Sequence, residues 1–198
     1  MNELNVSFIL DETGSMHVCR DTAISSFNEY LGDLKRRDEK IKFTLTKFNS
    51  ERTEIVCSAV DVKHVAELNK KTYIPNHWTP LYDAIGRTIN SLDGKDKALI
   101  VILTDGLENA SKEYNHRSIL DLIQKKMKDG WTFVYLGANQ DAWAVGRAIG
   151  IPGGNTFNFT YDTYVPAMET LSRATSNYVA NSGTQTDKFF EGADLTNK

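Results

Sequence analysis

The feature that most constrains the fold is a regular alternation of short apolar runs with helical patterns. Residues 98–103 (Ala-Leu-Ile-Val-Ile-Leu) form the most hydrophobic run, and residues 4–10 form a second one that stops at an aspartate. Such short apolar runs are consistent with strands that are buried on both faces of a sheet. Strands that alternate with helices predict a mostly parallel sheet with helices on both sides.

The other segments extend this pattern. Residues 40–48 and 53–60 alternate in polarity around Asn49-Ser50, which predicts a hairpin and one antiparallel edge strand. Further strands are expected at residues 131–136 and 156–159. Helices are expected over residues 24–34, 62–68, 79–94, 119–130, 141–149 and 165–179. We therefore expect an α/β fold with a doubly wound, mostly parallel open sheet, one antiparallel edge strand and helices on both faces.

Three polar motifs are placed where such a sheet binds ligands. Ligands of open parallel sheets bind outside the carboxyl ends of the strands, where the winding direction reverses. Asp11-Glu12-Thr13-Gly14-Ser15 follows the first apolar run, and Thr104-Asp105-Gly106 follows the strongest one. Thr79-Pro80 precedes the helix that leads into the strongest run, with threonine as the expected N-cap and proline at the first helical position. We expect these three loops to meet on one rim.

The chemistry of the three motifs is of one kind, because their side chains offer only hydroxyl and carboxylate oxygen. Hard cations such as magnesium prefer these ligands. Neutral hydroxyls leave much of the cation's charge uncompensated, so an incoming carboxylate can complete its shell. The sequence therefore predicts a Mg²⁺ site, with Mn²⁺ or Ca²⁺ as alternatives, and no catalytic residue. The expected ligands are Asp11, Thr13, Ser15, Thr79 and Asp105.

With these motifs in order, the chain resembles the von Willebrand factor A family and its metal-ion-dependent adhesion site. That family has Asp-x-Ser-x-Ser, then a distant threonine and a distant aspartate, on loops above a doubly wound sheet. Asp11, Thr13 and Ser15 match the first element, with Thr13 in place of the first serine; Thr79 matches the second and Asp105 the third. The resemblance implies that the hydroxyls touch the metal and that the aspartates often act through water.

The resemblance covers roughly residues 3–180. Within the family, the chain is most similar in layout to stand-alone bacterial or phage members. We therefore expect one domain over residues 1–180 and a polar tail over residues 181–198, either disordered or held by Phe189 and Phe190. The implied function is a binding module whose metal captures an acidic side chain of a partner protein, or of a neighbouring copy of this chain. His77 and Trp78, next to Thr79, are the expected partner-contacting rim.

Charged and imidazole side chains next to the motifs have simpler interpretations. Glu12 and Glu108 are expected to face solvent. His17 and His77 could indicate zinc, but no third histidine or cysteine has suitable spacing, and the oxygen-rich set disfavours that metal. Two cysteines, Cys19 and Cys57, fit neither a metal-ligand spacing nor a disulfide framework and are expected to be buried thiols.

Composition excludes several other classes of protein. The net charge of −3 argues against a nucleic-acid partner, since the short basic run Lys35-Arg36-Arg37 is interrupted at once by acidic residues. No apolar stretch is long enough to span a membrane. The amino-terminal residues lack the basic and apolar regions of a secretory signal, so a cytoplasmic protein is expected.

Two alternative functions remain open. One is a metal-dependent phosphohydrolase of the haloacid dehalogenase type, although that chemistry needs a second aspartate where Thr13 stands. The other is a scaffold whose metal only holds three loops together. A Walker nucleotide site is excluded because Gly-x-x-x-x-Gly-Lys is absent. A serine hydrolase is excluded because Gly14-Ser15-Met16 does not fit Gly-x-Ser-x-Gly.

Overall fold

The structure is a computed structural model, which describes residues 3–92, 94–95 and 97–193. At its centre lies a six-stranded sheet of order β3-β2-β1-β4-β5-β6. Only the β2–β3 pair is antiparallel among these strand pairs. This confirms the expected doubly wound sheet with one antiparallel edge strand. The strands are β1 (Leu4–Asp11), β2 (Ile41–Phe48), β3 (Thr53–Asp61), β4 (Ala98–Thr104), β5 (Thr132–Ala138) and β6 (Thr156–Phe159).

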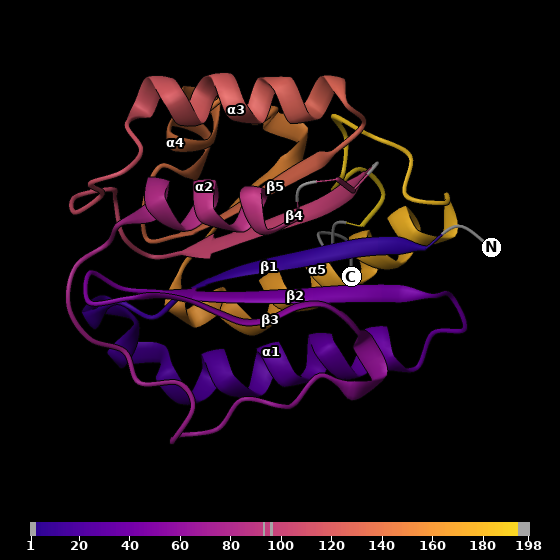
Figure 1. Cartoon of the computed structure of the whole chain (residues 1–198). Helices are drawn as coiled ribbons and strands as arrows, with labels where there is room; N and C mark the ends of the chain where they lie inside the picture. Colours follow the sequence, from indigo (N-terminus) through magenta and orange to yellow (C-terminus); the bar gives the residue numbers. More distant parts are fainter. Residues whose placement is uncertain (1–2, 93, 96, 194–198) are drawn as a thin grey trace.

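Helices cover both faces of the sheet (Figure 1). One face carries α1 and α5, and the other carries α2, α3 and α4, so that the sheet lies between two hydrophobic cores. Phe8 packs edge-on against Phe27 of α1 in the first core, whereas Ile85 and Ile123 lie in the second. The helices are α1 (Arg20–Lys35), α2 (Leu81–Ser91), α3 (His116–Lys128), α4 (Ala142–Ala148) and α5 (Tyr164–Ala180).

The two strands predicted to be central are neighbours. β1 pairs in parallel with β4, with Leu10 opposite Leu103, and also with β2 on its other side. The chain winds from β1 to β2 and β3 in one direction, then crosses to β4 and winds to β5 and β6 in the other. The switch in winding direction therefore lies between β1 and β4, where such sheets bind ligands.

Two predictions about helices are wrong. Residues 62–68 form only one 3-10 turn, Val62–His64, because Asn28 of α1 bonds both backbone groups of Leu68 and holds the following chain in an irregular course. Thr79 does not cap α2: the helix begins at Leu81, and Pro80 precedes it without a side-chain cap. The backbone of Thr79 instead bonds to Asn109 in both directions, which fixes it to the loop after β4.

The polar segment after α5 packs onto the domain as far as it is described. Phe189 and Phe190 are buried, and their rings contact Tyr178 and Phe157 respectively. Of the two expectations for this segment, anchoring by the phenylalanines is the one observed, because the exposed edge of the core offers aromatic partners there. The last five residues, 194–198, lie outside the described part.

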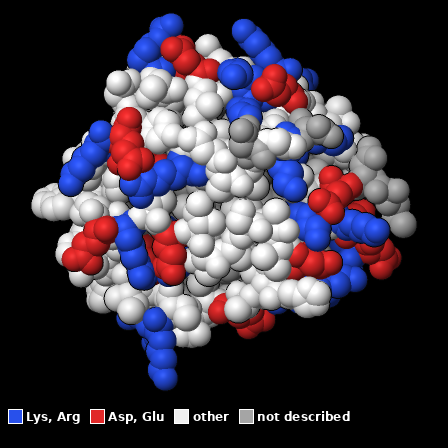
Figure 2. Space-filling view, in the orientation of Figure 1, with Lys and Arg blue, Asp and Glu red and all other residues white. Residues whose placement is uncertain are grey.

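No helix among the described residues is long and apolar enough to cross a membrane. On the face seen in Figure 2, acidic and basic side chains are intermixed. Cys19 is buried and Cys57 partly so, and both are free thiols.

Candidate metal centre

The fold brings the three predicted loops together at the carboxyl ends of β1 and β4. Asp11 is the last residue of β1, and Asp105 directly follows β4. Because these strands are neighbours, the Thr104 hydroxyl donates a 2.5 Å hydrogen bond to Oδ2 of Asp11. The other oxygen, Oδ1, accepts a 2.7 Å bond from the backbone N–H of Thr13 and so closes the turn after β1.

The oxygen atoms of the two aspartate loops form a continuous chain. The hydroxyls of Thr13 and Ser15 lie 3.2 Å apart, and Ser15 donates a 2.6 Å bond to Oδ1 of Asp105. Asp11 and Thr13 are buried, whereas Ser15 is exposed. The cluster is therefore anchored inside the domain and opens to the surface at Ser15.

Thr79 lies against the loop after β4. A Cβ atom added at Gly106 would come within 2.7 Å of Oγ1 of Thr79, so the threonine hydroxyl is directly beside this glycine. Within the described part of the chain, no hydrogen bond engages this hydroxyl, although the residue is only 4% exposed. All five predicted ligands thus belong to one cluster of loops. The hydroxyl oxygen of Thr79 is available there as a metal ligand.

The electrostatics of Asp11 set it apart from an ordinary buried carboxylate. The pKa of this carboxyl is raised to about 7, mainly by complete burial and in smaller part by the nearby charge of Asp105, against the lowering effect of hydrogen bonds from Thr104 and Thr13. Neither Asp11 nor Asp105 forms an ion pair with any described basic residue. Two carboxylates thus lie close together without a cation from the protein, an arrangement that an external cation would stabilise.

Tyr161 is a functional candidate that sequence reasoning missed. Its hydroxyl donates a 2.6 Å bond to Oδ2 of Asp105, the oxygen that Ser15 leaves free. Burial and the neighbouring carboxylate raise the pKa of Tyr161, so this phenol stays a neutral donor. The one available signal was its position two residues after β6, at the same edge of the sheet as the other loops.

The donor set fits a hard divalent cation. It consists of three hydroxyls and two carboxylates, the oxygen ligands that magnesium, manganese and calcium prefer. Across residues 3–92, 94–95 and 97–193, no cluster of three or more His, Cys, Asp or Glu side chains is placed to hold a metal. His77 is directed to Glu51, with 2.8 Å between Nε2 and Oε1, and not to these oxygens. The five donors are all oxygen, whereas a softer metal such as zinc prefers nitrogen and sulfur ligands.

The prediction that Glu12 and Glu108 face solvent is wrong. Glu12 is 1% exposed and pairs with Lys47, with 3.2 Å between Nζ and Oε1. Glu108 is half-buried, and its carboxylate accepts bonds from the backbone of Tyr82, Ala110 and Ser111. Both carboxylates therefore hold loops in place.

The predicted partner rim lies beside the cluster. Trp78 is 68% exposed, and its backbone N–H bonds to Ser50 in the β2–β3 turn. His77 has a φ of 65°, which is uncommon for a residue with a side chain, and its carbonyl accepts a 3.0 Å bond from Gly14. Two loops distant in sequence therefore join at His77 and Gly14.

No profile of a known protein family and no curated protein sequence matches the chain. Solved structures do match its fold. PilB minor pilin from Streptococcus sanguinis has a TM-score of 0.65 at 15% identity, over 88% of this chain and 61% of that one. Proximal thread matrix protein 1 from the mussel byssus has a TM-score of 0.63 at 15% identity, over 88% and 46%.

A third similar structure is a von Willebrand factor type A protein. The von Willebrand factor type A structure from Catenulispora acidiphila has a TM-score of 0.60 at 13% identity, over 88% of this chain and 43% of that one. This chain thus spans about half the length of the structures it matches. Together with the sheet order, these likenesses define a von Willebrand factor A-like α/β fold.

Proposed function

We propose that the protein is a binding module, not an enzyme, that holds one divalent cation at this rim and uses it to capture a carboxylate of a partner protein. The observation that carries the proposal is the pair of aspartates, Asp11 and Asp105, linked through hydroxyls and without a basic partner among the described residues. The cation would be held by Asp11, Thr13, Ser15, Thr79 and Asp105.

The charge balance of the donor set supports capture of an anion. When bound, Mg²⁺, or Mn²⁺ or Ca²⁺, supplies positive charge that three neutral hydroxyls leave uncompensated. The exposed position of Ser15 gives an outside group access to the cluster, whereas the buried Asp11 anchors it. A partner's aspartate or glutamate would complete the charge balance with a strong, charge-assisted contact.

The distribution of exposed apolar side chains supports a protein partner. Six of the eight large apolar side chains that are exposed in the described residues belong to segments at the carboxyl ends of parallel strands or to the loop that carries Thr79. Apolar side chains along this edge of the sheet offer a protein partner surface to contact next to the cluster. The six are Val18, Ile74, Trp78, Leu107, Trp143 and Val165.

The phosphohydrolase alternative gains no support from the geometry. Its acid would have to stand at position 13, where a threonine hydroxyl instead lies 3.2 Å from Ser15. We further propose that the protein is a stand-alone bacterial or phage member of the von Willebrand factor A family. In this proposal it is located in the cytoplasm and has no nucleic-acid or membrane partner.

Metal binding is tested by thermal unfolding with magnesium and with chelator. At a concentration of one hundred times the dissociation constant, a ligand of the folded state stabilises it by about 2.7 kcal/mol. For a domain of this size we expect the melting temperature to rise by roughly 5 to 10 °C. Asp11→Ala should lose this rise, and Asp38→Ala, an exposed aspartate before β2, should keep it. The same rise in both variants would exclude this site.

Capture of a carboxylate is tested on a purified partner. We expect chelator to weaken the complex, and Thr79→Ala to weaken it more than Asp38→Ala does. Equal affinity with and without the divalent ion would contradict capture and would leave the scaffold with a structural metal as the better function. A second copy of this chain is one candidate partner. Sedimentation with and without magnesium tests whether two copies associate through the metal.

A further inference from the structure

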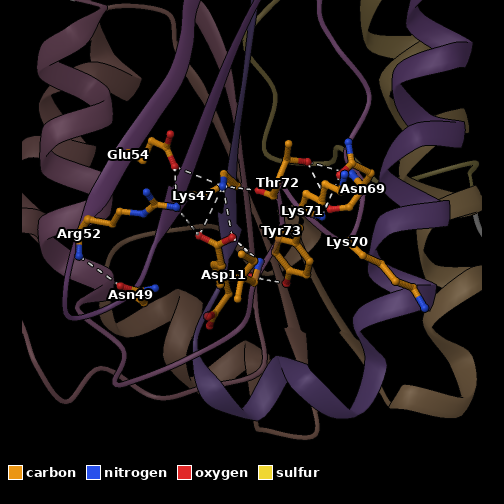
Figure 3. Close-up of polar contacts among 12 residues, drawn as sticks. Asp11, Lys47, Asn49, Arg52, Glu54, Asn69, Lys70, Lys71, Thr72 and Tyr73 are labelled. Atoms are coloured by element: carbon orange, nitrogen blue, oxygen red, sulfur yellow. Dashed lines mark hydrogen bonds and ion pairs between the residues drawn. The ribbon is translucent and has the colours of Figure 1, made fainter.

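Next to the candidate metal centre lies a buried ion pair that the proposed function does not use. Lys47 of β2 and Glu12 have side chains that are only 3% and 1% exposed, with 3.2 Å between Nζ and Oε1. Lys47 also contacts Glu54 of β3 at 3.2 Å, on the side of the pair nearer to solvent. Figure 3 shows Lys47 between Glu54 and Thr72, with Tyr73 beside Asp11.

The ion pair is joined to the irregular segment that leads to Thr79. The ammonium group of Lys47 donates a 2.5 Å bond to the carbonyl of Thr72, and Glu12 accepts a 2.7 Å bond from the backbone N–H of Ile74. Each member of the pair therefore holds one point of the segment. Since residues 72–79 form neither helix nor strand, these contacts replace the hydrogen bonds that regular structure would give.

Three further bonds fasten the same segment to the loop after β1. The Tyr73 hydroxyl donates a 2.5 Å bond to the carbonyl of Asp11, and the N–H of Asn76 bonds at 3.0 Å to the carbonyl of Glu12. The N–H of Gly14 bonds at 3.0 Å to the carbonyl of His77. The loop that carries Asp11, Thr13 and Ser15 is thus aligned with residues 73–77, and Thr79 follows two residues later.

We propose that the buried Glu12–Lys47 pair is the positioning element of the centre, which holds residues 72–79, and with them Thr79, in register with the loop after β1. Its effect on metal affinity rests on the proposed function. Groups outside the ligand shell that orient the ligands commonly change metal affinity by about 10- to 100-fold when removed. Glu12 and Lys47 are positioning residues: in the described part of the chain, neither side chain forms a hydrogen bond or ion pair with any of the five ligand side chains.

The test must separate positioning from stability. A single substitution breaks the buried pair and is expected to destabilise the chain strongly, whereas an apolar pair of similar volume is often tolerated. The test variant is therefore Glu12→Leu with Lys47→Met. The control variant is Glu54→Gln, which removes the solvent-side partner of Lys47 and leaves its contacts to Glu12 and Thr72 in place.

Two measurements are made on the wild type and both variants. Amide hydrogen exchange of the metal-free protein should show faster exchange at Ile74, Asn76 and Gly14 in the double variant only, with the amides of β1 and β4 unchanged. Calorimetric titration with MgCl₂ should then show affinity that is about 10- to 100-fold weaker in the double variant and unchanged in the control.

Each outcome decides a different point. Unchanged exchange at these three amides in the double variant would overturn the positioning role, and so would faster exchange with unchanged magnesium affinity. If the wild type bound no magnesium, the proposed function would fall, and the exchange data alone would decide whether the pair holds the segment.

Discussion

Asp11 and Glu12 are consecutive in the chain and both are buried, but their carboxylates are compensated in different ways. Glu12 pairs with Lys47 and accepts the N–H of Ile74. The carboxylate of Asp11 accepts bonds from the hydroxyl of Thr104 and the N–H of Thr13 but has no described basic partner, and its burial raises the pKa to about 7. A carboxylate that the protein has already paired with a cation can serve structure, whereas one that lacks such a partner is suited to an external cation.

The same contrast separates the two sides of the loop after β1. On the side of β2, charges of both signs meet in Lys47, Glu12 and Glu54. On the side of β4, hydroxyls and carboxylates meet without a described basic side chain. Neighbouring residues of one short loop thus have different roles. Glu12 belongs to the buried ion pair, and Asp11 and Thr13 belong to the candidate ligand cluster. The predictions that follow test this division from the largest expected effect to the smallest.

The largest effect is expected from Lys47→Met alone. This change leaves the buried carboxylate of Glu12 with Arg52, 4.0 Å away, as its remaining basic partner among the described residues, and breaking a buried pair typically costs about 3–5 kcal/mol in the free energy of unfolding. Urea denaturation of the metal-free protein measures it. The double variant with Glu12→Leu should recover most of that loss. A single variant as stable as the wild type would show that Glu12 does not depend on its lysine.

A smaller loss is expected from Gly106→Ala. The new Cβ would come within 2.7 Å of Oγ1 of Thr79, so the loop or the threonine must move. Overpacking of this kind costs about 1–3 kcal/mol, and we expect weaker magnesium binding in calorimetry. Gly153→Ala is the matched control, because nothing lies within 4 Å of its added Cβ. Equal magnesium affinities of the two variants would place Thr79 outside the site.

Tyr161→Phe should have a still smaller effect. It removes the 2.6 Å bond from the phenol to Oδ2 of Asp105 and keeps the ring in place. One hydrogen bond contributes about 1 kcal/mol to stability, which urea denaturation can resolve. Tyr135→Phe is a suitable comparison, because its hydroxyl makes a long, 3.4 Å contact with Gln140. A smaller loss for Tyr161→Phe than for Tyr135→Phe would contradict the role of Tyr161.

The smallest change in stability is expected for Trp78→Ala. The side chain is 68% exposed, and exposed substitutions usually change stability by less than about 0.5 kcal/mol. We expect unchanged unfolding and unchanged magnesium affinity, but a weaker complex with the partner. If Trp78→Ala left the partner complex intact, the partner would contact another part of the rim.

The sheet and the three motif loops could be predicted because their signals are local. The run at residues 98–103 and the motif that begins at Asp11 are each read within a few residues, and their adjacency follows from the topology of such sheets. The burial of Glu12 could not be predicted from the sequence, since its partner Lys47 lies 35 positions away. The contact of Tyr161 with Asp105 spans 56 positions and has no local signature. Thr79 lies beside Gly106 of the loop after β4, but it does not cap α2, because its backbone bonds to Asn109.

The most direct test of the division between Asp11 and Glu12 is a titration with Mn²⁺ followed by electron paramagnetic resonance, which counts bound ions without relying on stability. We expect one Mn²⁺ per chain in the wild type, competition by Mg²⁺, and no binding by Asp11→Asn. Glu54→Gln, which alters the charge cluster next to the site, should bind as the wild type does. Full Mn²⁺ binding by Asp11→Asn would contradict the assignment of Asp11 as the carboxylate that binds an external cation.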